Sequence, residues 1–243
     1  MDLHISDFTQ ENYGRLLDMV KAHYKFSNFS SYDKEEKFVL WRHDIDFSLE
    51  YSLQLARIEA GKGISSTFFF LPHCEFYNLL EKRSTNIVHE IASLGHEVGI
   101  HFDSHYYNVQ TEDQLEEFLE NENMLFRDII GIEPTTFSFH NTTEFTMSCV
   151  KMEYAGLISP YASYFQDNVE YCSDSNGYWR FERLQDFLEK GHQRIQVLTH
   201  PGWWQVEEKK PYDRVKLIAE QNMNELLTGY ENALKQYRRI NAK

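Results

Sequence analysis

Little in this sequence favours binding to nucleic acid or to an anionic membrane surface. The chain of 243 residues has 24 Lys and Arg against 38 Asp and Glu, a formal net charge of −14 with neutral histidines. Both kinds of partner are bound through basic surfaces, so we expect neither. No apolar run approaches the ~20 residues of a membrane-spanning helix, and Met1–Asp7 lacks the basic and apolar segments of a secretory signal. These absences predict a cytoplasmic protein without a membrane span.

Glycine, proline and cysteine are also scarce. With 11 Gly and 5 Pro there is little material for linkers or low-complexity tails. We therefore expect residues 1–243 to form a single domain with an N-terminal helix and a long C-terminal helix. The 3 cysteines, Cys74, Cys149 and Cys172, match neither a disulfide framework nor a zinc-binding pattern. The 11 histidines of this acidic chain are its unusual feature, and they raise the question of a metal site.

Strand and helix patterns alternate along most of the chain. Apolar runs predict strands at 38–43, 66–71, 96–101, 135–140, 157–159 and 194–199, with a weaker one at 178–181. Periodic apolar positions and capping residues predict helices at 7–25, 49–59, 85–94, 144–154 and 212–238, and one that opens at Thr111. This alternation predicts an α/β fold with a parallel sheet or barrel.

Polar side chains follow several of these predicted strands. In parallel sheets and barrels the functional site lies at the carboxyl ends of the strands. Six ionisable residues fall there: Asp44, Asp46, His101, His105, His140 and His200. Their clustering at one end of the sheet predicts a site that holds both carboxylates and imidazoles.

These residue types suit a divalent cation. His101 and His105 are four residues apart, and in a helical turn positions i and i+4 can share one ion. Asp44-Ile45-Asp46 adds two carboxylates, one of which could bind the ion while the other handles a proton. We expect one divalent ion, with zinc favoured by imidazole ligands and nickel, cobalt or iron(II) also compatible. For amide hydrolysis the second aspartate and His200 are then candidates for base and acid.

Four segments together resemble one known family. They are 42–46 (Arg-His-Asp-Ile-Asp), 66–69 (Ser-Thr-Phe-Phe), 95–105 (Gly-His-Glu-Val-Gly-Ile-His-Phe-Asp-Ser-His) and 198–200 (Leu-Thr-His). In this order they are similar to the polysaccharide deacetylases of carbohydrate esterase family 4, the NodB homology group, in an Asp-X-Asp variant. The resemblance covers roughly residues 38–204 and implies a distorted (β/α)7 barrel with parallel strands.

The resemblance also implies roles for individual residues. It makes Asp44 the catalytic base, Asp46, His101 and His105 the metal ligands, and His200 the general acid. The family's third motif, Arg-X-Pro-Tyr, has no counterpart at Phe137–Asn141, where neither Arg nor Pro occurs. Arg42 or His140 is expected to orient Asp44 instead.

The remaining candidates concern substrate binding. Asp174 and Trp179 loosely match the family's fourth motif. Trp203 and Trp204 follow His200 closely and either stack on a sugar ring or pack in the core, with one tryptophan expected in each part. Together with Arg42 and His140, these residues are the predicted substrate-binding set.

The function these expectations favour is metal-dependent hydrolysis of an N-acyl group, acetyl or similar, on an amino sugar. A cytoplasmic location would make the substrate a small or oligosaccharide precursor of a surface polysaccharide. Two alternatives stay open: a catalytically silent carbohydrate-binding or regulatory protein, and an amidohydrolase that acts on a non-sugar amide. The sequence leaves the oligomeric state undetermined.

Overall fold

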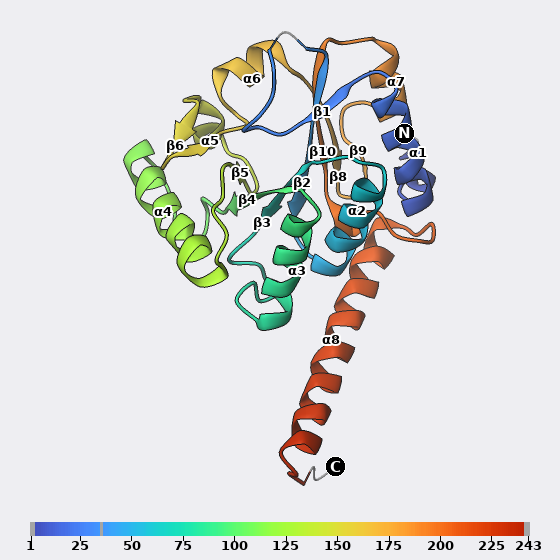
Figure 1. Cartoon of the computed structure of the whole chain (residues 1–243), viewed down its shortest axis with the longest axis vertical. Helices are drawn as coiled ribbons and strands as arrows, with labels where there is room; N and C mark the ends of the chain where they lie inside the picture. The colour runs from blue at the N-terminus through green and yellow to red at the C-terminus, as the bar shows by residue number, and fades with distance from the viewer. Residues whose placement is uncertain (1–2, 35, 241–243) are drawn as a thin grey trace.

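The computed structural model describes residues 3–34 and 36–240, and at its centre is a curled, mostly parallel sheet (Figure 1). The strand order is β5-β4-β3-β2-β10-β8-β9, and β1 pairs with β2 beside this path. In the described residues, seven strands run parallel: β1 (Lys25–Ser27), β2 (Phe38–Ile45), β3 (Thr67–Phe70), β4 (Glu97–Phe102), β5 (Phe137–Phe139), β8 (Glu170–Ser175) and β10 (Arg194–Thr199). The short strand β9 (Tyr178–Trp179) is antiparallel to β8, while β6 (Glu153–Tyr154) and β7 (Leu157–Ile158) form a separate antiparallel pair.

Helices surround this sheet. They are α1 (Gln10–Lys21), α2 (Leu49–Gly61), α3 (Lys82–Ser93), α4 (Glu112–Leu125), α5 (Glu144–Ser148), α6 (Ser163–Asn168), α7 (Leu184–Glu189) and α8 (Pro211–Gln236). Short helical turns lie at η1 (Ile5–Asp7), η2 (Phe126–Ile130) and η3 (Pro201–Trp203). No helix of the described residues is long and apolar enough to cross a membrane.

Local signals in the sequence account for where the helices begin. The Ser48 hydroxyl accepts a hydrogen bond from the Tyr51 backbone N–H at the start of α2, and Thr111 does the same for Gln114 at the start of α4. Each cap satisfies a backbone donor that has no partner within the helix.

Alternation along the strands sorts side chains between two faces. On β2, Val39 and Trp41 point to the outer face and pack against residues of α1, whereas Phe38 and Leu40 point to the inner, concave face and pack against Phe165 of α6. The same period of two continues to the end of β2, which places Arg42 and Asp44 on the inner face and His43 on the outer one. The strand pattern therefore brings the charged groups Arg42 and Asp44 to the carboxyl end of an inner face whose other end is lined by Phe38 and Leu40.

The predicted fold class is confirmed, and several details differ. The sheet is curled but not closed, since no ladder among the described residues joins β5 to β8 or β9. The predicted strand at 157–159 lies in the β6–β7 pair and not in the main sheet, and the predicted helix 144–154 ends at Ser148. Strands β1 and β8 were not predicted, because β1 has only three residues and β8, with the sequence Glu-Tyr-Cys-Ser-Asp-Ser, is mostly polar and has no apolar run.

Candidate active site

Asp44 is a buried carboxylate of the candidate site. The guanidinium of Arg42 donates to it through Nη2, at 2.9 Å from Oδ1 and 2.7 Å from Oδ2. The Ser138 hydroxyl on β5 lies 3.1 Å from each oxygen. Burial would raise the pKa of Asp44, but Arg42 and His101 outweigh it and hold the pKa below its usual value. Asp44 is therefore an ionised carboxylate with a fixed orientation.

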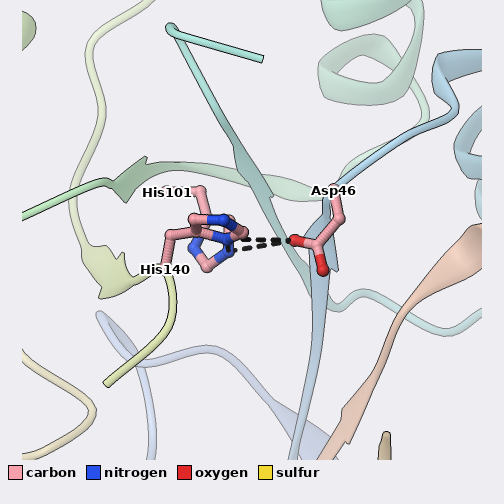
Figure 2. A group of neighbouring side chains, drawn as sticks. All are labelled: Asp46, His101 and His140. Carbon is pink, nitrogen blue, oxygen red and sulfur yellow. Dashed lines mark hydrogen bonds and ion pairs between the residues drawn. The ribbon is translucent and has the colours of Figure 1, made fainter. Parts of the chain in front are cut away.

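Asp46, His101 and His140 bring three potential metal-ligating atoms together at the carboxyl ends of β2, β4 and β5 (Figure 2). Asp46 Oδ1 lies 3.2 Å from His101 Nε2 and 3.5 Å from His140 Nδ1, and the two nitrogens are 3.2 Å apart. These three residues come from segments far apart in the sequence, and only the parallel arrangement of the strands unites them.

The spacing of these atoms fits a divalent cation. Ligand atoms at about 2.0–2.1 Å from a tetrahedral zinc ion are about 3.3–3.4 Å from one another, close to the separations observed. Asp46 Oδ1 is buried and accepts no well-formed hydrogen bond, so its lone pairs point at the space between the rings. Burial would raise the pKa of Asp46, but His200 and His101 outweigh it and keep the pKa well below the usual range.

Hydrogen bonds behind the two rings decide which nitrogens can bind an ion. Nδ1 of His101 lies 3.0 Å from the Ser138 hydroxyl and 3.3 Å from the Ser138 carbonyl oxygen. A proton on Nδ1 donated to that carbonyl leaves the lone pair of Nε2 for a metal. His140 is oriented by the Asn141 side-chain amide, 2.9 Å from Nε2. Ligation through His140 Nδ1 would put the proton on Nε2, so the amide would present its oxygen there.

The structure does not bring His105 to this cluster. Predicting it as a ligand required a helical turn from His101 to His105, but His101 lies within strand β4. After β4 the Asp103 carboxylate accepts the backbone N–H of His105 at 2.9 Å, which turns the chain. The exposed His105 ring then contacts the Asn141 carbonyl oxygen through Nε2 at 3.0 Å. His140 occupies the place predicted for His105.

His200 follows strand β10 and faces the cluster from the side opposite His101 and His140. Its Nδ1 is 2.5 Å from Asp174 Oδ1, and its Nε2 is 3.7 Å from Asp46 Oδ2. The Trp204 indole N–H donates to Asp174 Oδ2 at 3.0 Å. Burial would lower the pKa of His200, but Asp174 and Asp46 outweigh it and raise the pKa to about 9. The imidazole is therefore protonated near neutrality and has its Nε2–H directed to the site.

The predicted substrate-binding residues are distributed differently from the expectation. Arg42 is buried against Asp44 and orients this carboxylate, which was one of the two options expected for it. His140 joins the cluster of candidate metal ligands, and Asp174 holds His200. None of Trp179, Trp203 and Trp204 lines the cavity, because all three are buried in the outer cluster that packs beneath α1 and α8. Trp179 donates its indole N–H to Asp7 at 2.9 Å, and Trp203 packs edge-on against Phe47. The sugar-stacking role predicted for one tryptophan does not match this packing.

The carboxylates and imidazoles of the candidate site line one cavity of about 580 Å³. Asp44, Asp46, His101, His140 and His200 all line it. Asp174, which was predicted as a substrate-binding residue, also lines it. Other lining side chains were not among the predicted site residues, and they include Phe139, Met147, Tyr161, Phe165, Phe181 and the exposed Arg180. The alternating pattern of β8 was the signal that could have placed Tyr171 and Ser173 on the same inner face as the catalytic candidates.

Of the comparisons with known proteins, the one with solved structures finds similar chains. No family model and no curated protein sequence matches the chain. Among solved structures, a family 4 carbohydrate esterase from Bacillus anthracis is 16% identical, with 88% of this chain and 86% of that chain covered and a TM-score of 0.46. The catalytic domain of a peptidoglycan N-acetylglucosamine deacetylase from Eubacterium rectale is 17% identical, with coverages of 80% and 88% and a TM-score of 0.45.

A family 4 pseudoenzyme from Bacillus anthracis is also similar, at 14% identity, with 78% of this chain and 63% of that chain covered and a TM-score of 0.42. The family of these solved structures is the one whose motifs the sequence resembles. At such low sequence identity, the comparison says nothing about the reaction, which has to be inferred from the side chains of the site.

Proposed function

We propose that this protein is a metal-dependent hydrolase that removes an N-acyl group, acetyl or similar, from an amino sugar. The observation that carries this proposal is the convergence of three ligand atoms, on Asp46, His101 and His140, beside an ionised Asp44 and a protonated His200 in one cavity. Amide hydrolysis needs an activated water, a base that takes its proton and an acid for the departing amine. Asp46, His101 and His140 can hold the ion that activates the water, Asp44 can take its proton, and His200 can protonate the amine.

A divalent cation, when bound, supplies Lewis acidity and lowers the pKa of a water molecule. Zinc fits the two imidazoles and one carboxylate best, while nickel, cobalt and iron(II) are alternatives. Asp44 acts as the base, because Arg42 and Ser138 fix its carboxylate in the ionised form next to the ligand cluster. The two hydrogen bonds also restrict where the accepted proton can lie.

His200 acts as the acid. Asp174 fixes the ring through Nδ1 and favours its protonated form, which leaves Nε2–H to protonate the leaving nitrogen. An amine leaves far more readily after this proton transfer than as an anion. In this pair, the buried carboxylate of Asp174 orients the imidazole of His200, and the imidazole transfers the proton.

The cavity supports a small or terminal substrate. Its volume is in the range of sites that enclose a molecule of mono- or disaccharide size. Tyr161, Tyr171 and Phe181 offer aromatic faces for the apolar side of a pyranose ring, and Arg180 offers a cation for an anionic substituent. An intracellular sugar precursor carrying a phosphate fits these features, and the cytoplasmic location remains part of the proposal.

Metal binding tests the first half of the proposal. We expect Zn²⁺, Ni²⁺ or Co²⁺ to bind the metal-stripped protein with one-to-one stoichiometry in calorimetry and to raise its Tm. His140→Ala should weaken binding at least tenfold, whereas the matched variant His105→Ala should bind as the parent does. Absence of binding by the parent protein, or loss of binding in His105→Ala alone, would overturn the assignment.

Amine release tests the second half. N-acetylglucosamine, its short oligomers and a nucleotide-linked N-acetyl sugar are incubated with the metal-loaded protein, and new primary amine is quantified alongside N-formyl sugars and ureide-type amides. Release from a sugar supports the proposal. Release only from the ureides identifies the non-sugar amidohydrolase, and tight metal binding without any turnover identifies a silent carbohydrate-binding homologue.

A further inference from the structure

The C-terminal helix α8 leaves the body of the protein (Figure 1). Of its described residues, only Arg214 and Ile218, in its first part, are buried. Farther along, α8 contacts the body through a hydrogen bond from the Asn222 side chain to the Phe76 carbonyl oxygen at 2.9 Å and through an ion pair between Glu225 and Arg83. Beyond Glu225 the helix runs outward with both flanks open to solvent.

The outward part of α8 carries an apolar stripe. Met223, Leu227, Tyr230, Leu234 and Tyr237 are separated by four, three, four and three residues. This is the spacing that brings side chains onto one seam of a coiled coil. Met223 is 54% exposed, Leu227 and Tyr230 56% and Tyr237 64%. Leu226 widens the stripe on one flank and is exposed as well. Ile240, also exposed, follows the end of α8 at Gln236.

Charges on the same stretch are divided by position. Glu220, Glu225 and Glu231 occupy residues 219–231 without any basic residue. Lys235, Arg238 and Arg239 occupy residues 232–240 without any acidic one. Two copies of the helix side by side in parallel would place glutamates on glutamates and basic groups on basic groups. An antiparallel pair would place the acidic half of each copy along the basic half of the other.

We infer that the stripe on residues 223–240 is a self-association surface, on which a second copy of this chain docks with its α8 antiparallel. The apolar seam supplies the burial that an isolated helix cannot obtain, since helices in proteins gain most of their stability from packing of an amphipathic face. The charge division sets the direction. It also offsets the repulsion between two chains that each carry a formal charge of −14.

Oligomeric state tests the surface. Sedimentation equilibrium of the full chain between about 1 and 100 µM should show a dimer. Leu227→Glu places a charge in the seam and should shift the chain to monomer, with at least a tenfold rise in the dissociation constant. Asn232→Glu introduces the same charge on the opposite side of the helix and should remain dimeric. Circular dichroism and Tm of both variants show that the domain is folded.

Direction is tested by charge reversal. The triple variant Lys235→Glu, Arg238→Glu and Arg239→Glu should raise the dissociation constant at least tenfold at low salt. Adding Glu220→Lys and Glu231→Lys should restore association. In a parallel pair, the triple change would replace repulsion between basic side chains by repulsion between acidic ones, so the dissociation constant would stay unaltered. The self-association surface is overturned if the parent chain stays monomeric at 100 µM or if the Leu227→Glu variant still dimerises. The antiparallel direction is overturned if the triple variant associates as the parent does.

Discussion

Two buried carboxylates, Asp44 and Glu59, lie on opposite sides of strand β2. Asp44 belongs to the inner face, where Arg42 and Ser138 hold it beside the cavity. Glu59 belongs to α2 and meets the outer face, where His43 Nε2 lies 2.7 Å from its Oε1 and Ser66 donates to its Oε2. Both carboxylates are surrounded by a cation or imidazole and a hydroxyl, and both have a pKa below the usual value despite burial.

The two environments differ in access. Asp44 lines the cavity together with His101 and His200, so a substrate can reach it. Glu59 is completely enclosed by Tyr13, His43, Ser66 and the ring of His96, and it lines no part of that cavity. A perturbed pKa and a histidine partner therefore do not identify a catalytic group. A catalytic group also needs access to the substrate, which Asp44 has and Glu59 lacks. Glu59 instead links α1, α2, β2 and the start of β3 through its hydrogen bonds to Tyr13, His43 and Ser66.

Asp44→Asn should produce the largest change. The amide keeps the volume but removes the base, so we expect the rate of amine release to fall about 10²–10⁴-fold. Initial rates with the metal-loaded protein measure this effect. Metal content should stay at the parent level, because Asp46, His101 and His140 are untouched. A rate within a factor of ten of the parent would mean that another group accepts the proton.

Glu59→Gln should lower the stability of the protein but leave the rate of amine release nearly unchanged. Loss of the charge weakens hydrogen bonds to His43, Ser66 and Tyr13, and we expect the free energy of unfolding to fall by about 1–3 kcal/mol. Chemical denaturation gives this value directly. The rate per folded molecule should remain within about twofold of the parent. A large loss of rate in a fully folded Glu59→Gln protein would remove the distinction between the two faces of β2.

Glu122 on α4 extends the comparison to a carboxylate without adequate partners. His73 Nε2 lies 3.3 Å from Oε1, but neither carboxylate oxygen accepts a well-formed hydrogen bond. Burial raises the pKa of Glu122 above its usual value, against the opposing effect of His73. A folded-state pKa above the unfolded value of about 4.3 means that Glu122 costs stability above that pH and that the cost disappears below it.

Glu122→Gln should therefore stabilise the protein at neutral pH by about 1 kcal/mol, or about 2–4 °C in Tm for a chain of this size. The gain should shrink as the pH falls toward 4. Thermal melts at a series of pH values measure it. A destabilised variant at pH 7, or a gain that grows on acidification, would show that His73 satisfies the carboxylate after all.

Trp204→Phe should produce the smallest change. Phenylalanine retains much of the packing but removes the N–H bond to Asp174, which should cost about 1 kcal/mol of stability. His200 Nδ1 keeps its own bond to Asp174, so the rate should fall less than tenfold. Trp203→Phe, which loses no bond to Asp174, is the matched control. A thousandfold fall in rate for Trp204→Phe alone would show that this indole hydrogen bond is needed to position Asp174 and His200.

Much of the site could be predicted without the structure. The alternation of β2 and the rule for the carboxyl ends of parallel strands were enough to group Asp44, Asp46, His101, His140 and His200. The helix caps at Ser48 and Thr111 were equally local, since each depends on a hydroxyl and a backbone N–H three residues apart. The scarcity of cysteine and the acidic balance were properties of composition alone.

What could not be predicted depended on directions and contacts between distant segments. The choice of His140 over His105 was decided by the turn at Asp103 and by the neighbouring end of β5, neither of which follows from residue spacing. The tryptophans near His200 were assigned to packing only once α1 and α8 covered them. The sequence by itself determined which chemical groups reach the end of the sheet, because strand period and connection order are local properties. Only the tertiary structure decided which atoms meet there, because that depends on side-chain directions and on packing between segments distant in the chain.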